Sequence, residues 1–334
     1  MTHPKVQHYV PDFLLRNFCA PTAKGRKVFV FDKVSRASFP TNTKNIVCES
    51  KFYDFEHEGS EYSLEPTLSN IEALARPIVA ELITRLRIPR SSDYAEQMAA
   101  MALFIAVQLA RTPWHRDRLA EMPALLAQHL KAMNEQWSDQ IDELLKTPDP
   151  NAKKREGSIF LLNWARRATP ILVQKHWLLL TTDRRSPFLI GDNPVARTNQ
   201  MSGPPPFERG NTGIASTGVE IYLPLSSTVT LALFCDSVVD QIIENAGRLS
   251  AMPAHSVRSS PDLTETKAKL DTFCHALNSG EAVRAHPENV RHLNSLQVIH
   301  AERFLISSSS DFRLAQEMLT NYPELRVGPR ITVA

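Results

Sequence analysis

Apolar and polar positions follow the period of an α-helix through much of the first half of the chain. Between residues 62 and 87 an apolar side chain recurs every three or four positions, which predicts an amphipathic helix bent at Pro77. The positions that carry this pattern are Leu64, Leu68, Ile71, Ala75, Ile78 and Leu82. A second helix is predicted from a cap at Ser91 or Ser92 to about Arg111. Because residues 98–110 are apolar on all sides, we expect this helix to lie buried at the centre of the fold.

Later segments change the picture from helices alone to helices with a sheet. Further helices are predicted at 117–146, 156–175, 236–248, 262–279, 287–301 and up to about 321, with a polar loop at 146–157. Runs rich in β-branched and aromatic residues predict strands at 27–33, 50–55, 176–183, 187–192, 219–225, 228–234 and 303–308. This order predicts an α+β fold. We expect a large helical block with a central buried helix, packed with a mixed, mostly antiparallel sheet from the second half.

The domain organisation follows from the same pattern. We expect a single unit over residues 1–334, with a weak joint near residue 150 between a mostly helical half and a sheet-containing half. The Pro- and Gly-rich stretch 196–213 is long for a connection inside a domain. It is either a lid or binding loop, or an excursion without a role.

Composition adds the class of protein. A net charge of +2 gives no overall attraction to nucleic acid or membrane, so contact with an anion would need a local patch. The four cysteines have no metal-binding spacing, which favours free thiols in a cytoplasmic protein. The first residues lack a signal-peptide pattern, and the apolar run 98–110 is too short to span a bilayer. The sequence leaves the oligomeric state open.

The opening stretch HYVPDFLLRNF places polar groups in an otherwise apolar segment. His8 and Tyr9 precede the predicted start of a short helix at Pro11, and Arg16 points away from its apolar face. His8 is a candidate general base or metal ligand, and Tyr9 and Arg16 are candidate substrate-binding residues. A histidine that bonds a backbone carbonyl would explain His8 as well.

Further charged side chains lie on or next to the predicted helices. Glu65 and Glu72 border the apolar face of helix 62–87, and we expect Glu72 to pair with Arg76 one turn on. That leaves Glu65 as the candidate catalytic carboxylate. Arg111 ends a buried helix and must find an anion, either Glu65 or a phosphate or carboxylate of a ligand. Arg116 is the second candidate for substrate binding.

The stretch FLIGDNPVA brings a further carboxylate to the end of a strand. Asp192 is a candidate metal ligand or base there, and Asn193 a candidate substrate-binding residue. An Asx-turn before Pro194 explains the same residues without a ligand.

These stretches resemble a bacterial family described as a domain of unknown function, DUF4238. The resemblance rests on HYVPDFLLRNF, KFYDF, LEPTLSNIE, RTPWHR and GDNPV, then on LN at 293–294 and AERFLISSSSDF at 301–312. It covers the chain from residue 8 to about 312 and implies one family unit. It brings no reaction, substrate or cofactor.

Three functions fit these residues. The first is a metal-assisted hydrolase, nuclease-like or phosphodiesterase-like, acting on an anionic, phosphate-containing small molecule or nucleic acid. Asp192, Glu65 and His8 would hold a divalent cation, and Arg111 and Arg116 would neutralise the substrate. The alternatives are a non-catalytic ligand-sensing or interaction protein with a buried polar network, and a metal-independent nucleotide transferase or lyase. In the non-catalytic alternative, Glu65 and Asp192 would be bonded inside the protein, whereas an enzyme would need them to face a cavity.

Overall fold

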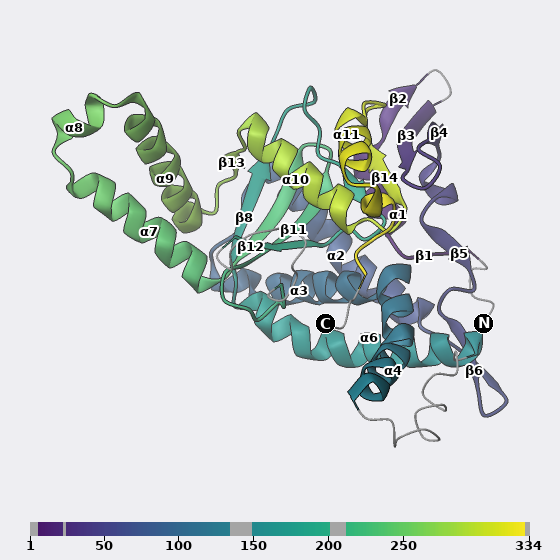
Figure 1. The fold of residues 1–334 in the computed structure, drawn as a ribbon. Coiled ribbons are helices and arrows are strands. Elements are labelled where there is room, and N and C mark those ends of the chain that lie inside the picture. The colour runs from purple at the N-terminus through teal and green to yellow at the C-terminus, as the bar shows by residue number, and fades with distance from the viewer. Residues whose placement is uncertain (1–5, 23–24, 134–148, 201–211, 331–334) are drawn as a thin grey trace.

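A five-stranded sheet lies at the middle of the protein (Figure 1). The computed structural model describes residues 6–22, 25–133, 149–200 and 212–330. The strand order is β10–β11–β12–β8–β13, and every neighbouring pair is antiparallel except the parallel pair of β13 and β8. The strands are β8 (His176–Thr181), β10 (Ala196–Asn199), β11 (Val219–Ser226), β12 (Val229–Phe234) and β13 (Val283–Arg284). This confirms the predicted α+β fold with a mixed, mostly antiparallel sheet.

Both faces of this sheet are covered, which explains why its strands read as continuous apolar runs. On β8, Trp177 and Leu179 pack into the core shared with the first helices, whereas Leu178 packs into a second core on the opposite face. On β11, Ile221 and Tyr222 divide in the same way. The sheet therefore separates the molecule into two layers of helices.

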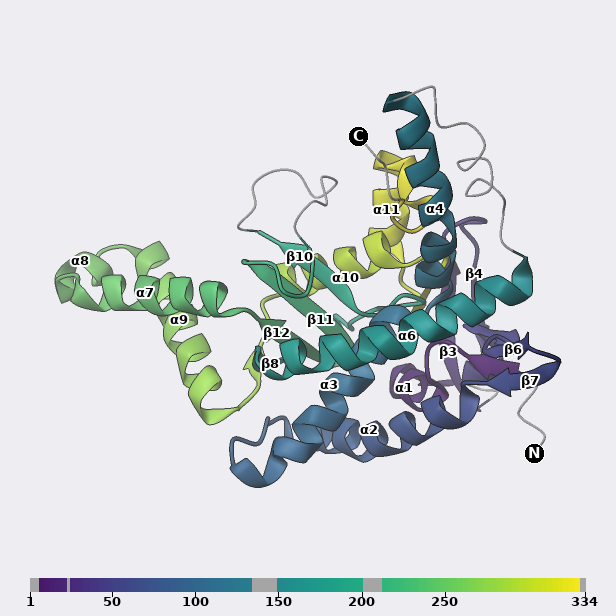
Figure 2. The ribbon, with the colours of Figure 1, turned by 90° about the horizontal axis from the view of Figure 1, so that it is seen from below.

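The first layer is the predicted helical block, and α3 runs through its centre (Figure 2). Most side chains of α3 from Met101 onward are buried. The indole N–H of Trp164 on α6 donates to the Ala106 carbonyl at 3.1 Å, which fixes α6 against α3. The helices of this block are α2 (Glu65–Arg85), α3 (Ala95–Ala110), α4 (Pro113–Met133) and α6 (Pro150–Val173). Among the described residues, no helix is both long and apolar enough to cross a membrane.

The second layer consists of α10 and of a helical arm that extends away from the sheet (Figure 1). The arm leaves β12, turns back at its tip and returns to the sheet at β13. Its helices are α7 (Asp236–Ala251), α8 (Ala254–Arg258) and α9 (Pro261–Ser279), and α10 spans Pro287–His300. Gly280 ends α9 with a φ of +78°, and its carbonyl accepts the Ile88 N–H at 2.7 Å.

A second sheet joins the two ends of the chain. Its order is β2–β3–β14–β9, with β4 on β3, so a strand from the N-terminal part pairs with one from the C-terminal part. Helices α11 (Arg313–Asn321) and α10 cover it. Its strands are β2 (Ala20–Thr22), β3 (Gly25–Asp32), β4 (Ser38–Thr41), β9 (Ile190–Gly191) and β14 (Phe304–Ser307). The remaining elements near the N-terminus are α1 (Asp12–Leu15), β1 (Val6–His8), β5 (Cys48–Ser50), β6 (Asp54–His57) and β7 (Ser60–Ser63).

Four predicted segments have other boundaries in the structure. Within the strand predicted at 50–55, residues 51–53 form a turn, because β5 ends at Ser50 and β6 begins at Asp54. The predicted loop 146–157 is helical from Pro150, because the Asp149 carboxylate accepts two N–H groups of the first turn. The helix predicted at 117–146 begins at Pro113, and residues 134–148 lie outside the described part of the chain. Of the predicted loop 196–213, the first four residues form β10, and 201–211 are likewise not described.

Candidate functional site

Arg111, the residue that ends α3, is the centre of a buried polar cluster. Its guanidinium donates to the Tyr53 hydroxyl at 2.9 Å, to a Glu72 carboxylate oxygen at 2.7 Å and to the His8 carbonyl at 2.7 Å. Only 1% of the Arg111 side chain is exposed. The nearby Tyr53 and Glu72 raise the pKa of Arg111 although burial alone would lower it, so the guanidinium stays charged.

The expected internal ion pair of Arg111 is confirmed, but its predicted partner was wrong. Glu72, not Glu65, accepts from Arg111. The predicted pairing of Glu72 with Arg76 is replaced by this contact, and Arg76 instead lies over the Phe13 ring at 5.5 Å. Glu65 opens α2, and its charge adds to the burial that raises the pKa of Tyr53 to about 12.

The opening segment is held through its backbone. The carbonyl of His8 accepts from Arg111, and that of Tyr9 accepts from the Gln108 amide at 2.8 Å. The His8 ring lies 3.1 Å from the Thr43 carbonyl through Nε2, which is the structural role weighed above for this residue. Tyr9 packs its ring on Phe52, and burial raises the pKa of its hydroxyl.

Asp192 is enclosed by backbone at the end of β9. Its carboxylate accepts the N–H groups of Glu302, Arg303 and Phe304 at 2.7, 2.8 and 2.9 Å. These three residues lead from α10 into β14, so the bonds to Asp192 hold this link in place. Burial raises the pKa of Asp192 to about 6, while the backbone bonds and the charge of Lys33 oppose the shift.

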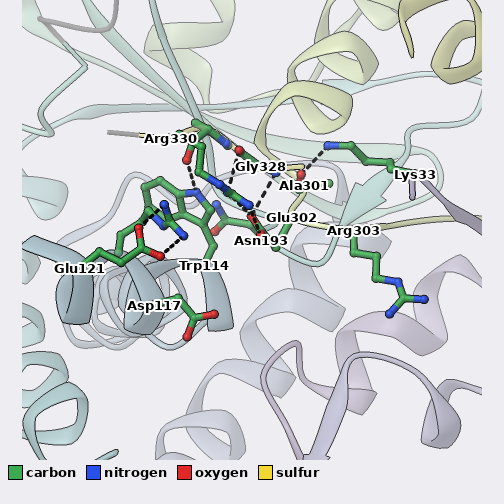
Figure 3. A network of polar contacts seen from close by, with 12 residues as sticks. Lys33, Trp114, Asp117, Glu121, Asn193, Ala301, Glu302, Arg303, Gly328 and Arg330 are labelled. Carbon is green, nitrogen blue, oxygen red and sulfur yellow. Dashed lines mark hydrogen bonds and ion pairs between the residues drawn. The ribbon is translucent and has the colours of Figure 1, made fainter. Parts of the chain in front are cut away.

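The neighbouring Asn193 ties two parts of the fold together. Its Oδ1 accepts from the Thr112 hydroxyl at 3.3 Å, and its Nδ2 donates to the His300 carbonyl at 3.2 Å. Figure 3 shows this region, in which Lys33 donates to the Ala301 carbonyl and Arg330 donates to the Glu302 carboxylate. Asp192 and Asn193 thus connect α10 with the junction between α3 and α4.

The two other predicted arginines are also engaged. Arg16 is exposed and pairs with Asp12 at 2.5 Å within the first helical turns. Arg116 stacks on the Phe52 ring at 4.0 Å and lies 3.5 Å from Glu49. The cavity that borders Arg111 and Arg116 has a volume of about 20 Å³, room for about one water molecule.

The predicted metal ligands do not form one set. His8, Glu65 and Asp192 come from three elements and each has its own surroundings. Among the described residues, no three His, Cys, Asp or Glu side chains lie close enough together to hold a metal ion. Most of the described residues that were predicted to bind a ligand therefore make contacts within the protein, and we call the bonds of Arg111, Asp192 and Asn193 the polar network.

A much larger cavity lies on the other face of the central sheet, and we call it the sheet cavity. Its volume is about 730 Å³. The sheet forms its floor, α7 and α9 form one wall and α10 forms the other. Its lining is mostly apolar, and includes Leu180, Tyr222, Phe234, Phe273 and Leu293.

One carboxyl group, that of Glu220, lies in the floor of the sheet cavity. Glu220 sits on β11 and accepts a hydrogen bond from the Tyr222 hydroxyl. Burial raises the pKa of Glu220, and the bond from Tyr222 opposes this shift. The sequence contained a signal for it, because an acid interrupts the apolar strand VEIYLPL, but the prediction of that strand passed over the acid.

The family can now be stated. A family model described as "Protein of unknown function (DUF4238)" matches residues 6–311. The chain belongs to the DUF4238 family. No curated protein and no solved structure matched it. The matched range of this DUF4238 protein contains both the polar network around Arg111 and Asp192 and the sheet cavity.

Proposed function

We propose that this DUF4238 protein is a non-catalytic ligand-binding protein whose small organic ligand occupies the sheet cavity. The observation that carries the proposal is the cavity itself. Its volume of about 730 Å³ falls in the range of about 300–1,000 Å³ that is usual for small-molecule sites. Its mostly apolar lining with a few polar groups is also usual for such sites.

The polar network supports the non-catalytic reading. Arg111 and Asp192 each make three hydrogen bonds inside the protein, and the cavity beside Arg111 holds about one water. A buried charged group that is bonded to several elements in this way fixes how those elements pack. Arg111 lies with α2 in the helical layer on the opposite face of the sheet from the cavity, and Asn193 bonds the carbonyl of His300 on α10, which forms one wall of the cavity. The network therefore acts as scaffold for the sheet cavity.

The metal-assisted hydrolase and the nucleotide transferase stay predictions. The hydrolase needs carboxylates and an imidazole around one cation, and no observation among the described residues favours such a group. An anionic substrate or nucleic acid belongs to that hypothesis. We also propose a cytoplasmic location, because Cys19, Cys48, Cys235 and Cys274 are all free thiols in the structure.

The experiment measures the binding of a neutral apolar dye, N-phenyl-1-naphthylamine, whose fluorescence rises when it moves from water into an apolar site. Thr272→Trp places a large ring on the cavity side of α9, since Thr272 lines the sheet cavity and is exposed. Thr266→Trp is the matched control, because Thr266 is an exposed threonine of the same helix that does not line this cavity.

We expect the wild-type protein and Thr266→Trp to bind the dye with equal affinity. Thr272→Trp fills part of the cavity and should weaken binding by about tenfold or more, the effect of losing roughly 1.4 kcal/mol. Thermal unfolding checks that both variants are folded. The proposed function would be refuted if the wild-type protein caused no rise in dye fluorescence. Equal affinities of Thr272→Trp and Thr266→Trp for the dye would refute it as well.

A further inference from the structure

Glu220 faces the sheet cavity because of its place in the strand order. Glu220 and Tyr222 are two residues apart on β11, so both point to the face of the sheet that carries α10 and the arm. Phe234 stands directly opposite Glu220 on β12. Only 8% of Glu220 is exposed, and Glu220 is one of the residues that line the cavity.

The described residues give Glu220 no cationic partner. Of the basic groups that line the cavity, Lys269 pairs with Glu265 at 2.6 Å and Arg284 pairs with Asp183 at 2.9 Å. The histidines of the lining are His286, which caps the start of α10, and His292 on α10, and neither is paired with Glu220. A buried carboxylate is costly unless a cation compensates it. Within the described part of the chain, Glu220 receives the Tyr222 hydroxyl and no cation.

Aromatic rings surround this carboxyl group. The Tyr222 and Phe234 rings meet edge to face at 6.1 Å, and the Phe234 and Phe273 rings do so at 5.4 Å. All three residues line the sheet cavity. Aromatic faces attract cations, most strongly where water is excluded, and quaternary ammonium groups are recognised in this way.

We propose that the ligand of the sheet cavity is an organic cation, an amine or quaternary ammonium with an apolar body, whose charge lies against Glu220. This proposal rests on the proposed function, because it names the class of ligand for the same cavity. The carboxylate supplies the counter-charge, and the rings of Tyr222, Phe234 and Phe273 enclose the apolar part. An anion would meet the carboxylate with like charge.

Binding would couple to the protonation of Glu220. Burial raises the pKa of Glu220, so its carboxylate takes up a proton at a higher pH than that of an exposed glutamate. A bound cation favours the carboxylate, and the displaced proton goes to solvent. Affinity for a cation therefore falls as the pH is lowered through the raised pKa of Glu220. The other titratable groups around the cavity are Tyr222, Glu265, Lys269, Arg284, His286 and His292.

The test compares two probes of equal shape. Benzyltrimethylammonium and neopentylbenzene differ in one atom, a positively charged nitrogen in place of a carbon. Each is titrated by NMR against the wild-type protein, Glu220→Gln and Glu244→Gln. Glu244→Gln is the control, because it removes an exposed carboxylate of α7 that pairs with Arg248 outside the cavity.

We expect wild-type protein and Glu244→Gln to prefer the ammonium over its carbon isostere by at least about tenfold, from ion pairing and cation–π attraction. Glu220→Gln keeps a polar group beside Tyr222 and should lose this preference while it still binds the isostere. As the pH is lowered from 8 to 4, the affinity of the wild-type protein for the ammonium should fall, whereas its affinity for the isostere should not change.

The outcomes separate this inference from the proposed function. Equal binding of both probes by the wild-type protein would overturn the cation site and leave the cavity as a neutral binding site. Binding of neither probe would overturn both proposals. If Glu220→Gln does not fold, the pH comparison on the wild-type protein still decides, since a flat profile for the ammonium excludes Glu220 as its counter-charge.

Discussion

Replacing Arg111 by methionine tests whether the polar network serves the fold. Arg111→Met keeps a long side chain but removes the guanidinium that bonds Tyr53, Glu72 and the His8 carbonyl. Breaking a buried ion pair on one side costs about 3–5 kcal/mol, because the other charge stays behind unpaired. The Glu72 side chain keeps 20% exposure, so water relieves part of its cost and we expect about 3–4 kcal/mol.

The expected loss converts into a thermal shift. A chain of 334 residues has an unfolding entropy of about 0.7 kcal mol⁻¹ K⁻¹ near its midpoint. Arg111→Met should then unfold about 4–6 °C below the wild-type protein. Arg85→Met is the matched control, because Arg85 pairs with Glu81 on an exposed face of α2 and should change stability by less than about 0.5 kcal/mol.

A double-mutant cycle isolates the ion pair. Glu72→Gln leaves the two other bonds of Arg111 in place. The pair Arg111→Met and Glu72→Gln should together cost less than the sum of the single changes, by about 1–2 kcal/mol. Calorimetry and urea unfolding measure each free energy, and the dye titration should show unchanged binding to the folded Arg111→Met protein. An Arg111→Met protein as stable as the wild type, with its dye binding lost, would show that Arg111 serves a ligand and that the reasoning is wrong.

Two further predictions concern single positions. The pKa of Asp192 rises from 3.8 to about 6 on folding, so its contribution to stability is present below pH 4 and is lost as the pH rises through 6. The stability of the wild-type protein relative to Asp192→Asn should therefore fall by about 2 kcal/mol between pH 4 and pH 7, and a constant or rising difference in urea unfolding would contradict this. Gly280→Ala should cost about 3 kcal/mol or more, because a Cβ there would lie 2.0 Å from the Ile88 oxygen at a φ of +78°. Gly247→Ala on α7 meets open space and should instead add about 0.5–1 kcal/mol, so equal thermal midpoints for the two alanine variants would refute the packing argument.

The sequence predicted long elements well and short ones poorly. Helices α2 and α3 were predicted because many turns of one period outweigh local exceptions such as Pro77. Strand β13 was not predicted, and the strand predicted at 187–192 is reduced to the two residues of β9. Both strands have two residues, and their pairing is created by neighbours far away in the chain. Such strands carry no period of their own. The start of α6 was a missed signal, since Asp149 followed by Pro150 is a regular helix beginning.

The partner of Arg111 shows where sequence reasoning about the network ends. A buried guanidinium needs an anion, and this requirement alone predicted the internal ion pair. Glu65 and Glu72 are seven residues apart, so they share one side of α2 and differ by about 10 Å along its axis. Which of the two meets Arg111 depends on how far α2 is shifted along its axis relative to α3. The sequence alone does not give this shift.

Glu220 and Asp192 show why a polar residue in an apolar strand does not by itself mark a binding site. Both are acids near the ends of buried strands, and burial raises the pKa of both. The Asp192 carboxylate accepts hydrogen bonds from three backbone N–H groups in the link between α10 and β14. Glu220 receives one hydroxyl and no described cation, and it borders a cavity. Hydrogen-bonding capacity that the fold leaves unused, together with space for another molecule, separates a binding group from a structural one. This distinction points away from the residues that attract attention in the sequence and toward Glu220.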